Sequence, residues 1–251
     1  MKTYILLLTL LFTTFSPAQQ IPANAKKLID AYPNQIKGFK NNNIIFKDNT
    51  TLVYDDGKKK TAQQLLDNPD IEDQFLYPYT TGKSTSNTKA QDPGRIRNEE
   101  FFKKIYGNSK AAVEQQLVNI NWCPKLVNQK IKVTSANGLD KIVKSLSAEL
   151  DTHPELKKYL TNIGGTFNWR MIAGTKRLSM HSFGMTIDIN VKYSNYWQWD
   201  CKCKSENTKL SYKNQIPEQL IAIFEKHGFI WGGKWYHYDT MHFEYRPELL
   251  N

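Results

Sequence analysis

Residues 179–188 read SMHSFGMTID, and residues 239–242 read DTMH. These two short segments contain two of the five histidines of the chain. They also supply a carboxylate seven residues after the first histidine and another three residues before the second. A catalytic zinc ion needs three protein ligands, an open position for water and a base that is not itself a ligand. Two imidazoles, one ligating carboxylate and one spare carboxylate meet this need, so the segments predict a hydrolytic zinc site.

The first segment runs into a predicted strand, 185–191, in which polar and apolar residues alternate. Alternating side chains point to opposite faces of a strand. Asp188 is therefore expected on the polar face, with the apolar residues packed on a core. Gly184 allows a sharp bend just before the strand, so that His181 can fold back over the same polar face.

The second segment runs into a predicted final strand, 241–245, on which His242 and Glu244 share one face. Glu244 is thus either a hydrogen-bond partner for a ligating histidine or an exposed strand residue. Asp239 would face away on a straight strand, so we expect it in the preceding turn, within reach of water on the metal. Each residue taken alone also fits an ordinary structural role, and the joint pattern is what favours a metal site.

The pattern S-x-H-x-x-G-x-x-x-D followed by D-x-x-H-F-E resembles the zinc peptidases of the D-alanyl-D-alanine carboxypeptidase and L-alanoyl-D-glutamate endopeptidase family. Their fold is shared with the hedgehog signalling domain, and the resemblance covers residues 98–249. It implies that the zinc ligands are His181, Asp188 and His242. It also implies that Asp239 is the general base and acid, and that Arg170 holds the substrate carbonyl or carboxylate.

Two departures from the family pattern concern single positions. The dipeptidase members carry Glu where Asp239 stands, which bears on cleavage specificity, and Thr186 replaces a commonly smaller Ala. Weaker candidates for substrate contact are Ser179, Arg177 and His237.

The resemblance implies hydrolysis of peptidoglycan stem peptides, with D-alanyl-D-alanine carboxypeptidase activity favoured. One alternative is an endopeptidase that cuts L-Ala–D-Glu bonds or cross-bridges. Another, from a different class, is a non-catalytic zinc module that binds the cell wall or a protein, because a fold does not by itself specify an activity.

Periodicity in the rest of the C-terminal part predicts helices followed by a late cluster of strands. This order favours the α+β class, with helices packed on a small antiparallel sheet. The predicted helices are 98–106, 109–120, 139–151 and 218–227, and the predicted strands are 130–135, 166–172, 185–191 and 241–245.

The N-terminal part divides into three predicted regions. Residues 1–18 have a basic residue, an apolar run and a small-residue cleavage site, which are typical of a secretory signal peptide. Residues 19–94 are an extension and linker, with a helix near 24–32, a hairpin over 43–54 and a polar stretch from 82. The zinc peptidase domain follows at 95–251. No other segment is apolar enough to cross a membrane, and the pattern specifies no oligomeric state.

Charge and cysteine content fit an exported protein. The formal net charge is +10, spread along the chain without a nucleic-acid recognition motif. We therefore expect a periplasmic or extracellular location and no nucleic-acid partner. The positive charge fits either binding to a polyanionic envelope surface or simply a soluble basic surface. In such a compartment a disulfide is expected. We predict that Cys123 pairs with Cys201 or Cys203, because a bridge within the C-x-C pair would be strained.

Overall fold

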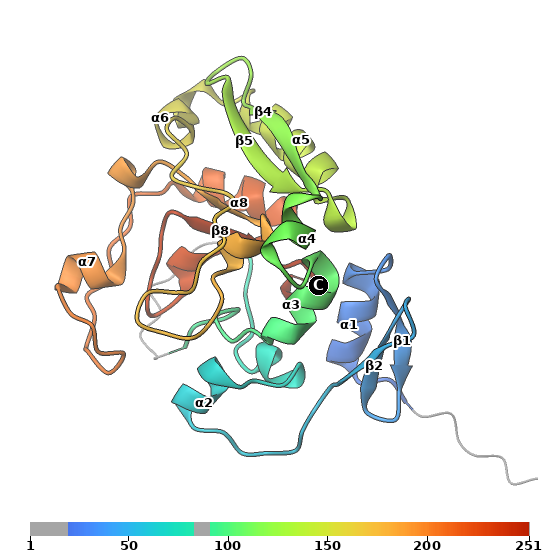
Figure 1. Ribbon diagram of the computed structural model, residues 1–251. Coiled ribbons are helices and arrows are strands. Elements are labelled where there is room, and N and C mark those ends of the chain that lie inside the picture. Colours follow the sequence, from blue (N-terminus) through green and yellow to red (C-terminus); the bar gives the residue numbers. More distant parts are fainter. Residues whose placement is uncertain (1–19, 83–90, 251) are drawn as a thin grey trace, which may run out of the picture.

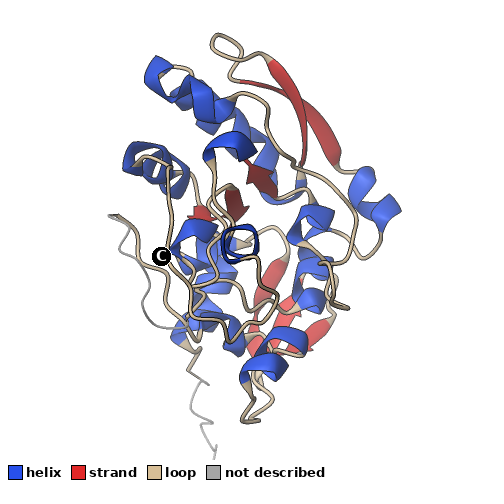
Figure 2. Cartoon of the chain, turned by 90° about the vertical axis from the view of Figure 1, so that its left-hand side faces the viewer, coloured by secondary structure: helices blue, strands red, loops and turns tan. Residues whose placement is uncertain are grey.

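The computed structural model describes residues 20–82 and 91–250 (Figure 1). The predicted signal peptide and residues 83–90 of the predicted linker lie outside the described residues. The described part combines helices with three separate antiparallel sheets, which confirms the α+β class (Figure 2). None of the helices in this part combines the length and apolar character that a bilayer crossing requires.

The central sheet brings the two motif segments together. Its strands, in spatial order, are β6 (Thr186–Asp188), β8 (His242–Tyr245) and β7 (Phe229–Trp231). Asp188 pairs with His242, and Thr186 pairs with Glu244. Directly paired residues of an antiparallel ladder point to the same face. These four polar side chains therefore share one face, as the alternation predicted, although both strands are shorter than predicted.

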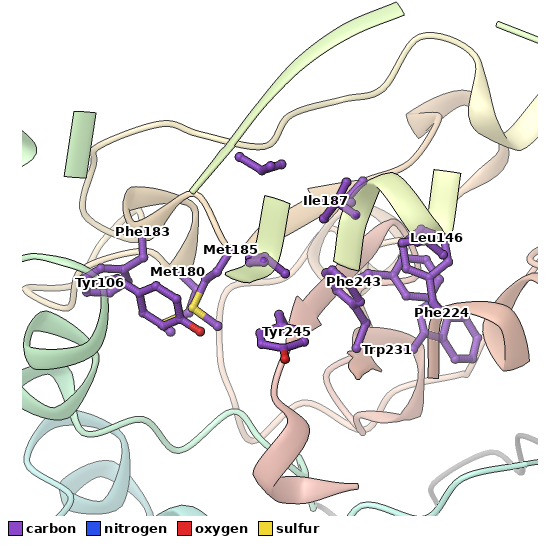
Figure 3. Packing of buried hydrophobic residues seen from close by; sticks show 14 of the residues in the cluster. Tyr106, Leu146, Met180, Phe183, Met185, Ile187, Phe224, Trp231, Phe243 and Tyr245 are labelled. Atoms are coloured by element: carbon purple, nitrogen blue, oxygen red, sulfur yellow. The ribbon is translucent and has the colours of Figure 1, made fainter. Parts of the chain in front are cut away.

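The other face of the central sheet packs on the main hydrophobic core (Figure 3). Phe243 stacks on Phe224 of α8 (Glu218–Lys226), with ring centroids 3.9 Å apart, and its centroid lies 6.4 Å from that of Trp231. Helix α5 (Leu139–Leu150) packs against α8. Its apolar stripe is buried at Leu139, Val143, Leu146 and Leu150. Buried aromatic and aliphatic side chains each contribute about 1.5–3 kcal/mol, so the strands that carry the site rest on a stable platform.

A separate two-stranded sheet corrects one prediction. Strand β4 (Leu117–Trp122) pairs along its length with β5 (Gln129–Thr134). The predicted helix 109–120 is therefore wrong in its second half, since α4 covers only Lys110–Glu114. Its apolar spacing also fits a strand, on which buried Ile120 and Trp122 alternate with exposed residues. Pairing with β5 satisfies the backbone of both strands, and this non-local partner decides between the two structures.

The N-terminal part carries the predicted hairpin and two helices. Its elements are α1 (Ala23–Ala31), β1 (Ile36–Lys40), β2 (Asn43–Phe46), β3 (Thr51–Val53) and α2 (Ala62–Asp67). Thr61 forms a capping box with Gln64 at the start of α2, which satisfies free backbone N–H groups there. Leu28 of α1 belongs to the same hydrophobic cluster as Phe101 of α3 (Glu99–Tyr106). The two shorter helices of the C-terminal part are α6 (Lys157–Leu160) and α7 (Trp197–Cys201).

The predicted strand 166–172 is not formed. The backbone N–H of Asn168 donates to the carbonyl oxygen of His181, and that of Arg170 donates to Ser182 Oγ. These groups therefore bond to the 3₁₀ turn Met180–Phe183 instead of a neighbouring strand. The segment wraps around the turn that carries His181.

The predicted disulfide is also wrong. Cys201 is bonded to Cys203, and Cys123 is a free, buried thiol. Lys202 adopts a left-handed backbone conformation with φ of 53°, which brings the flanking Cα atoms to 5.2 Å. Cys123 lies in the main core beneath α5, where its backbone N–H donates to Ser147 Oγ.

Candidate metal centre

Three predicted ligands from separate elements converge on one point. His181 lies in the 3₁₀ turn, Asp188 ends β6 and His242 begins β8. His181 Nε2 is 3.0 Å from Asp188 Oδ2, and His242 Nδ1 is 3.0 Å from Asp188 Oδ1. The three donor atoms all lie within 4.8 Å of one another. Two imidazole nitrogens and a carboxylate oxygen in this arrangement fit a zinc ion that keeps an open coordination position.

Gly184 makes the local fold possible. It ends the 3₁₀ turn with φ of +64°, a backbone conformation that L side chains rarely adopt. A Cβ atom placed here would lie 2.7 Å from Leu117 Cδ2 and 3.2 Å from the backbone nitrogen of Thr134. A glycine therefore allows the chain to turn from His181 directly into β6.

The ring nitrogens that face away from Asp188 have their own partners. His181 Nδ1 is 2.8 Å from Thr186 Oγ1 and 3.2 Å from the carbonyl oxygen of Thr166. His242 Nε2 is 3.2 Å from Glu244 Oε2. Such outer hydrogen bonds fix the orientation and tautomer of ligating histidines. Thr186, which departs from the family pattern, thus contacts a predicted ligand.

Charges within the cluster are strongly coupled. Burial disfavours the charged form of Asp188, but the two neighbouring imidazoles outweigh it and hold its pKa well below the usual range. Burial likewise disfavours the imidazolium of His242, yet its hydrogen bonds to Asp188 and Glu244 raise its pKa to about 10. A bound cation would take the place of protons here, because metal ligands must be deprotonated.

Asp239 lies in the turn before β8, as expected, and its Oδ1 is buried without a hydrogen-bond partner among the described residues. Burial and the negative charge of Asp188 raise its pKa to about 6. A buried carboxylate with an unpaired oxygen can accept a proton near neutral pH. This property matches the requirement for a general base.

Two further predicted residues flank the turn of His181. The side chain of Arg170 is exposed, and its Nη1 lies 3.4 Å from the carbonyl oxygen of Met171. Ser179 is buried, and its backbone N–H donates to the carbonyl oxygen of Arg170. Arg170 is thus anchored to this turn through its backbone while its guanidinium faces solvent.

His237 belongs to a different cluster. Its Nδ1 is 2.7 Å from Asp92 Oδ2, and its Nε2 is 2.9 Å from the carbonyl oxygen of Glu206. Arg95 binds both of these acidic side chains and so already supplies their counter-charge. The structure therefore places both nitrogens of His237 against Asp92 and Glu206, rather than beside the three converging ligands.

Arg177 lies on a cavity of about 300 Å³ that is also lined by Arg95 and Arg97. Its Nε is 3.4 Å from Asp67 Oδ1 at the end of α2. Burial and the two neighbouring arginines lower its pKa.

Sequence reasoning missed one residue of the site, Arg97. Arg97 Nη2 is 2.6 Å from Glu244 Oε2, and its guanidinium lies over the Trp235 ring, 5.4 Å from the centroid. The Trp235 ring in turn lies 5.6 Å from that of His242. Arg97 is 147 positions from Glu244, and no local motif marks it.

The comparisons with known proteins gave one match. The family model described as D-alanyl-D-alanine carboxypeptidase matches residues 173–245. Neither the curated proteins nor the solved structures contain a significant match. The matched segment includes the three converging residues and Asp239, and it supports the resemblance seen in the motifs. Residues 173–245 are thus similar to peptidases of the D-alanyl-D-alanine carboxypeptidase type.

Proposed function

We propose that the protein is an exported zinc metallopeptidase that hydrolyses peptidoglycan stem peptides, with D-alanyl-D-alanine carboxypeptidase activity favoured. The observation that carries this proposal is the convergence of His181, Asp188 and His242, together with a buried, unpaired Oδ1 on Asp239, whose pKa responds to the charges of all three. A purely structural zinc site is closed by four protein ligands. Three ligands and a spare carboxylate favour catalysis over a non-catalytic module.

The roles of the chain's own residues are part of this proposal. A zinc ion held by His181, Asp188 and His242 would supply a water whose pKa falls to roughly 7. Asp239 would take a proton from this water and return it to the leaving amine. The exposed guanidinium of Arg170 is available to orient the substrate carbonyl or carboxylate. A preorganised group of this kind is typically worth about 3 kcal/mol of transition-state stabilisation.

Location and partner follow from the N-terminus and the charge. The signal-like residues 1–18 support export to the periplasm or the cell exterior. A net charge of +9 remains after Lys2 is removed from the formal +10. This balance favours a polyanionic cell envelope, and we propose peptidoglycan peptides as the substrate and no nucleic-acid partner.

Product mapping tests the function. We expect the purified mature protein, loaded with zinc, to release D-alanine from muropeptides ending in D-alanyl-D-alanine, and a chelator to abolish the release. Mass spectrometry of digested sacculi would instead reveal cleavage at L-Ala–D-Glu or at cross-bridges, which would assign an endopeptidase. If zinc-loaded protein leaves every stem peptide intact, the enzymatic assignment fails and the zinc-binding module is favoured.

A further inference from the structure

A chain of buried polar contacts joins the end of α1 to the candidate ligand His242. We call it the buried polar chain, and its members in order are Tyr32, Glu248, Arg246, Glu244 and His242. Tyr32 donates its hydroxyl proton to Glu248 Oε2 at 2.7 Å, and Arg246 Nε donates to the other oxygen of Glu248. Arg246 Nη1 donates to Glu244 Oε1 at 3.0 Å. Glu244 Oε2 lies 3.2 Å from His242 Nε2.

The buried polar chain is shielded from solvent, and its charges are balanced. Tyr32, Glu244, Arg246 and Glu248 are each 0% exposed. The two glutamates face two arginines, Arg246 within the chain and Arg97 beside Glu244. A buried ionic group that loses its partner is costly. Each member is therefore held in one position by the next.

At one end of the buried polar chain, Glu244 determines how His242 is oriented. Arg97 and Arg246 bind Glu244 from two directions, which fixes its carboxylate toward His242 Nε2. His242 Nδ1 is then turned toward Asp188. An outer-shell carboxylate that orients a ligating histidine typically changes metal affinity by about 10–100-fold when it is removed.

The other end of the buried polar chain, Tyr32, belongs to the N-terminal extension. Tyr32 directly follows α1, and α1 packs on the 3₁₀ turn Pro247–Leu249, which carries Glu248. Figure 1 shows α1 beside the C-terminal end of the chain. The ring of Tyr32 is fixed by Phe101, with centroids 5.5 Å apart in an edge-to-face contact. The hydroxyl of Tyr32 is thus held against Glu248 by the packing of the extension.

We propose that Tyr32 is a positioning residue for the metal ligand His242, acting through the buried polar chain. This inference rests on the proposed function only in taking His242 as a zinc ligand. It assigns a role to the N-terminal extension: α1 helps to hold the peptidase site in its metal-binding geometry.

A matched pair of variants tests the proposal. Tyr79 also donates its hydroxyl proton to a buried glutamate at 2.7 Å, Glu225, and accepts the backbone N–H of Trp231 at 3.0 Å, and both contacts lie outside the buried polar chain. We expect both Tyr32→Phe and Tyr79→Phe to lower the unfolding midpoint of the metal-free protein, and Tyr79→Phe to lower it at least as much because it loses two hydrogen bonds. Only Tyr32→Phe should weaken Zn²⁺ binding, by about threefold to tenfold, at the low end of outer-shell effects. Affinity is measured by competition with a chromogenic chelator, independently of peptidase activity.

Two further variants test whether the loss of zinc affinity increases along the buried polar chain toward His242. Glu248→Gln should weaken Zn²⁺ binding more than Tyr32→Phe does, and Glu244→Gln should weaken it most. Wild-type zinc affinity in Tyr32→Phe, or an equal loss in Tyr79→Phe, would overturn the proposal. Absence of zinc binding by the wild-type protein would overturn the proposed function as well, so the two failures are distinguishable.

Discussion

Replacing Asp92 by Asn perturbs the cluster that anchors the turn before β8. Asp92 Oδ1 accepts the backbone N–H of His237 at 2.9 Å, and Oδ2 faces His237 Nδ1 and Arg95 Nη1 at 2.7 and 2.8 Å. His237 lies two residues before Asp239. An Asn side chain keeps the shape of Asp92 but loses its charge.

The size of the effect follows from the pKa of Asp92. Burial opposes its charged form, but the hydrogen bond from His237 and the charge of Arg95 outweigh this and lower the pKa from 3.8 to about 2. The fall of the pKa from 3.8 to about 2, at about 1.4 kcal/mol per pKa unit, amounts to about 2.5 kcal/mol of folding free energy. The side chain is 13% exposed, so a small discount for solvent screening leaves about 2 kcal/mol.

The pH dependence of this term has a definite sign. The folded-state pKa lies below the unfolded value, so the stabilisation is complete above about pH 4 and is lost as the pH falls toward 2. We expect urea unfolding to show Asp92→Asn less stable by about 2 kcal/mol at pH 7, with the difference roughly halved by pH 3. A difference that stays constant from pH 7 to 3, or one below about 0.5 kcal/mol at pH 7, would refute the reasoning.

Three further predictions concern the site and the core. Asp239→Asn should lower kcat by about 100- to 10,000-fold, as expected for loss of a general base. The zinc content, measured by metal analysis, should stay at the wild-type level. A variant that keeps wild-type kcat would remove Asp239 from the mechanism. Gly184→Ala should cost about 1–2 kcal/mol for its left-handed backbone alone, and more from the contact with Leu117 Cδ2; denaturant unfolding measures the loss, and an unchanged midpoint would contradict it. Cys123 should resist a thiol reagent in the folded protein and react on unfolding. The thiol is buried, and this burial and the charge of Asp151 raise its pKa to about 12. Rapid labelling under native conditions would contradict this prediction.

The parts of the site that could be predicted are those in which neighbouring residues carry the signal. His181, Gly184 and Asp188 lie within eight positions, so a bend followed by an alternating strand predicts their common face. The polar face shared by His242 and Glu244 follows from the same alternation. The one-to-one pairing of Asp188 with His242 is a register between strands, and no local pattern specifies it.

The error in the predicted helix 109–120 shares a physical origin with the missed residue Arg97. Leu117 and Ile120 are spaced for a helix, yet they form a strand because residues 129–134 offer a complete ladder of hydrogen bonds. In the same way, Arg97 enters the site only because the central sheet presents a buried carboxylate, Glu244, that needs a cation. A buried charge needs a partner, but the sequence does not specify where along the chain this partner lies. The tertiary fold determines the partner. For this reason a residue such as Tyr32, which contacts Glu248, can be connected to a predicted ligand more than 200 positions away.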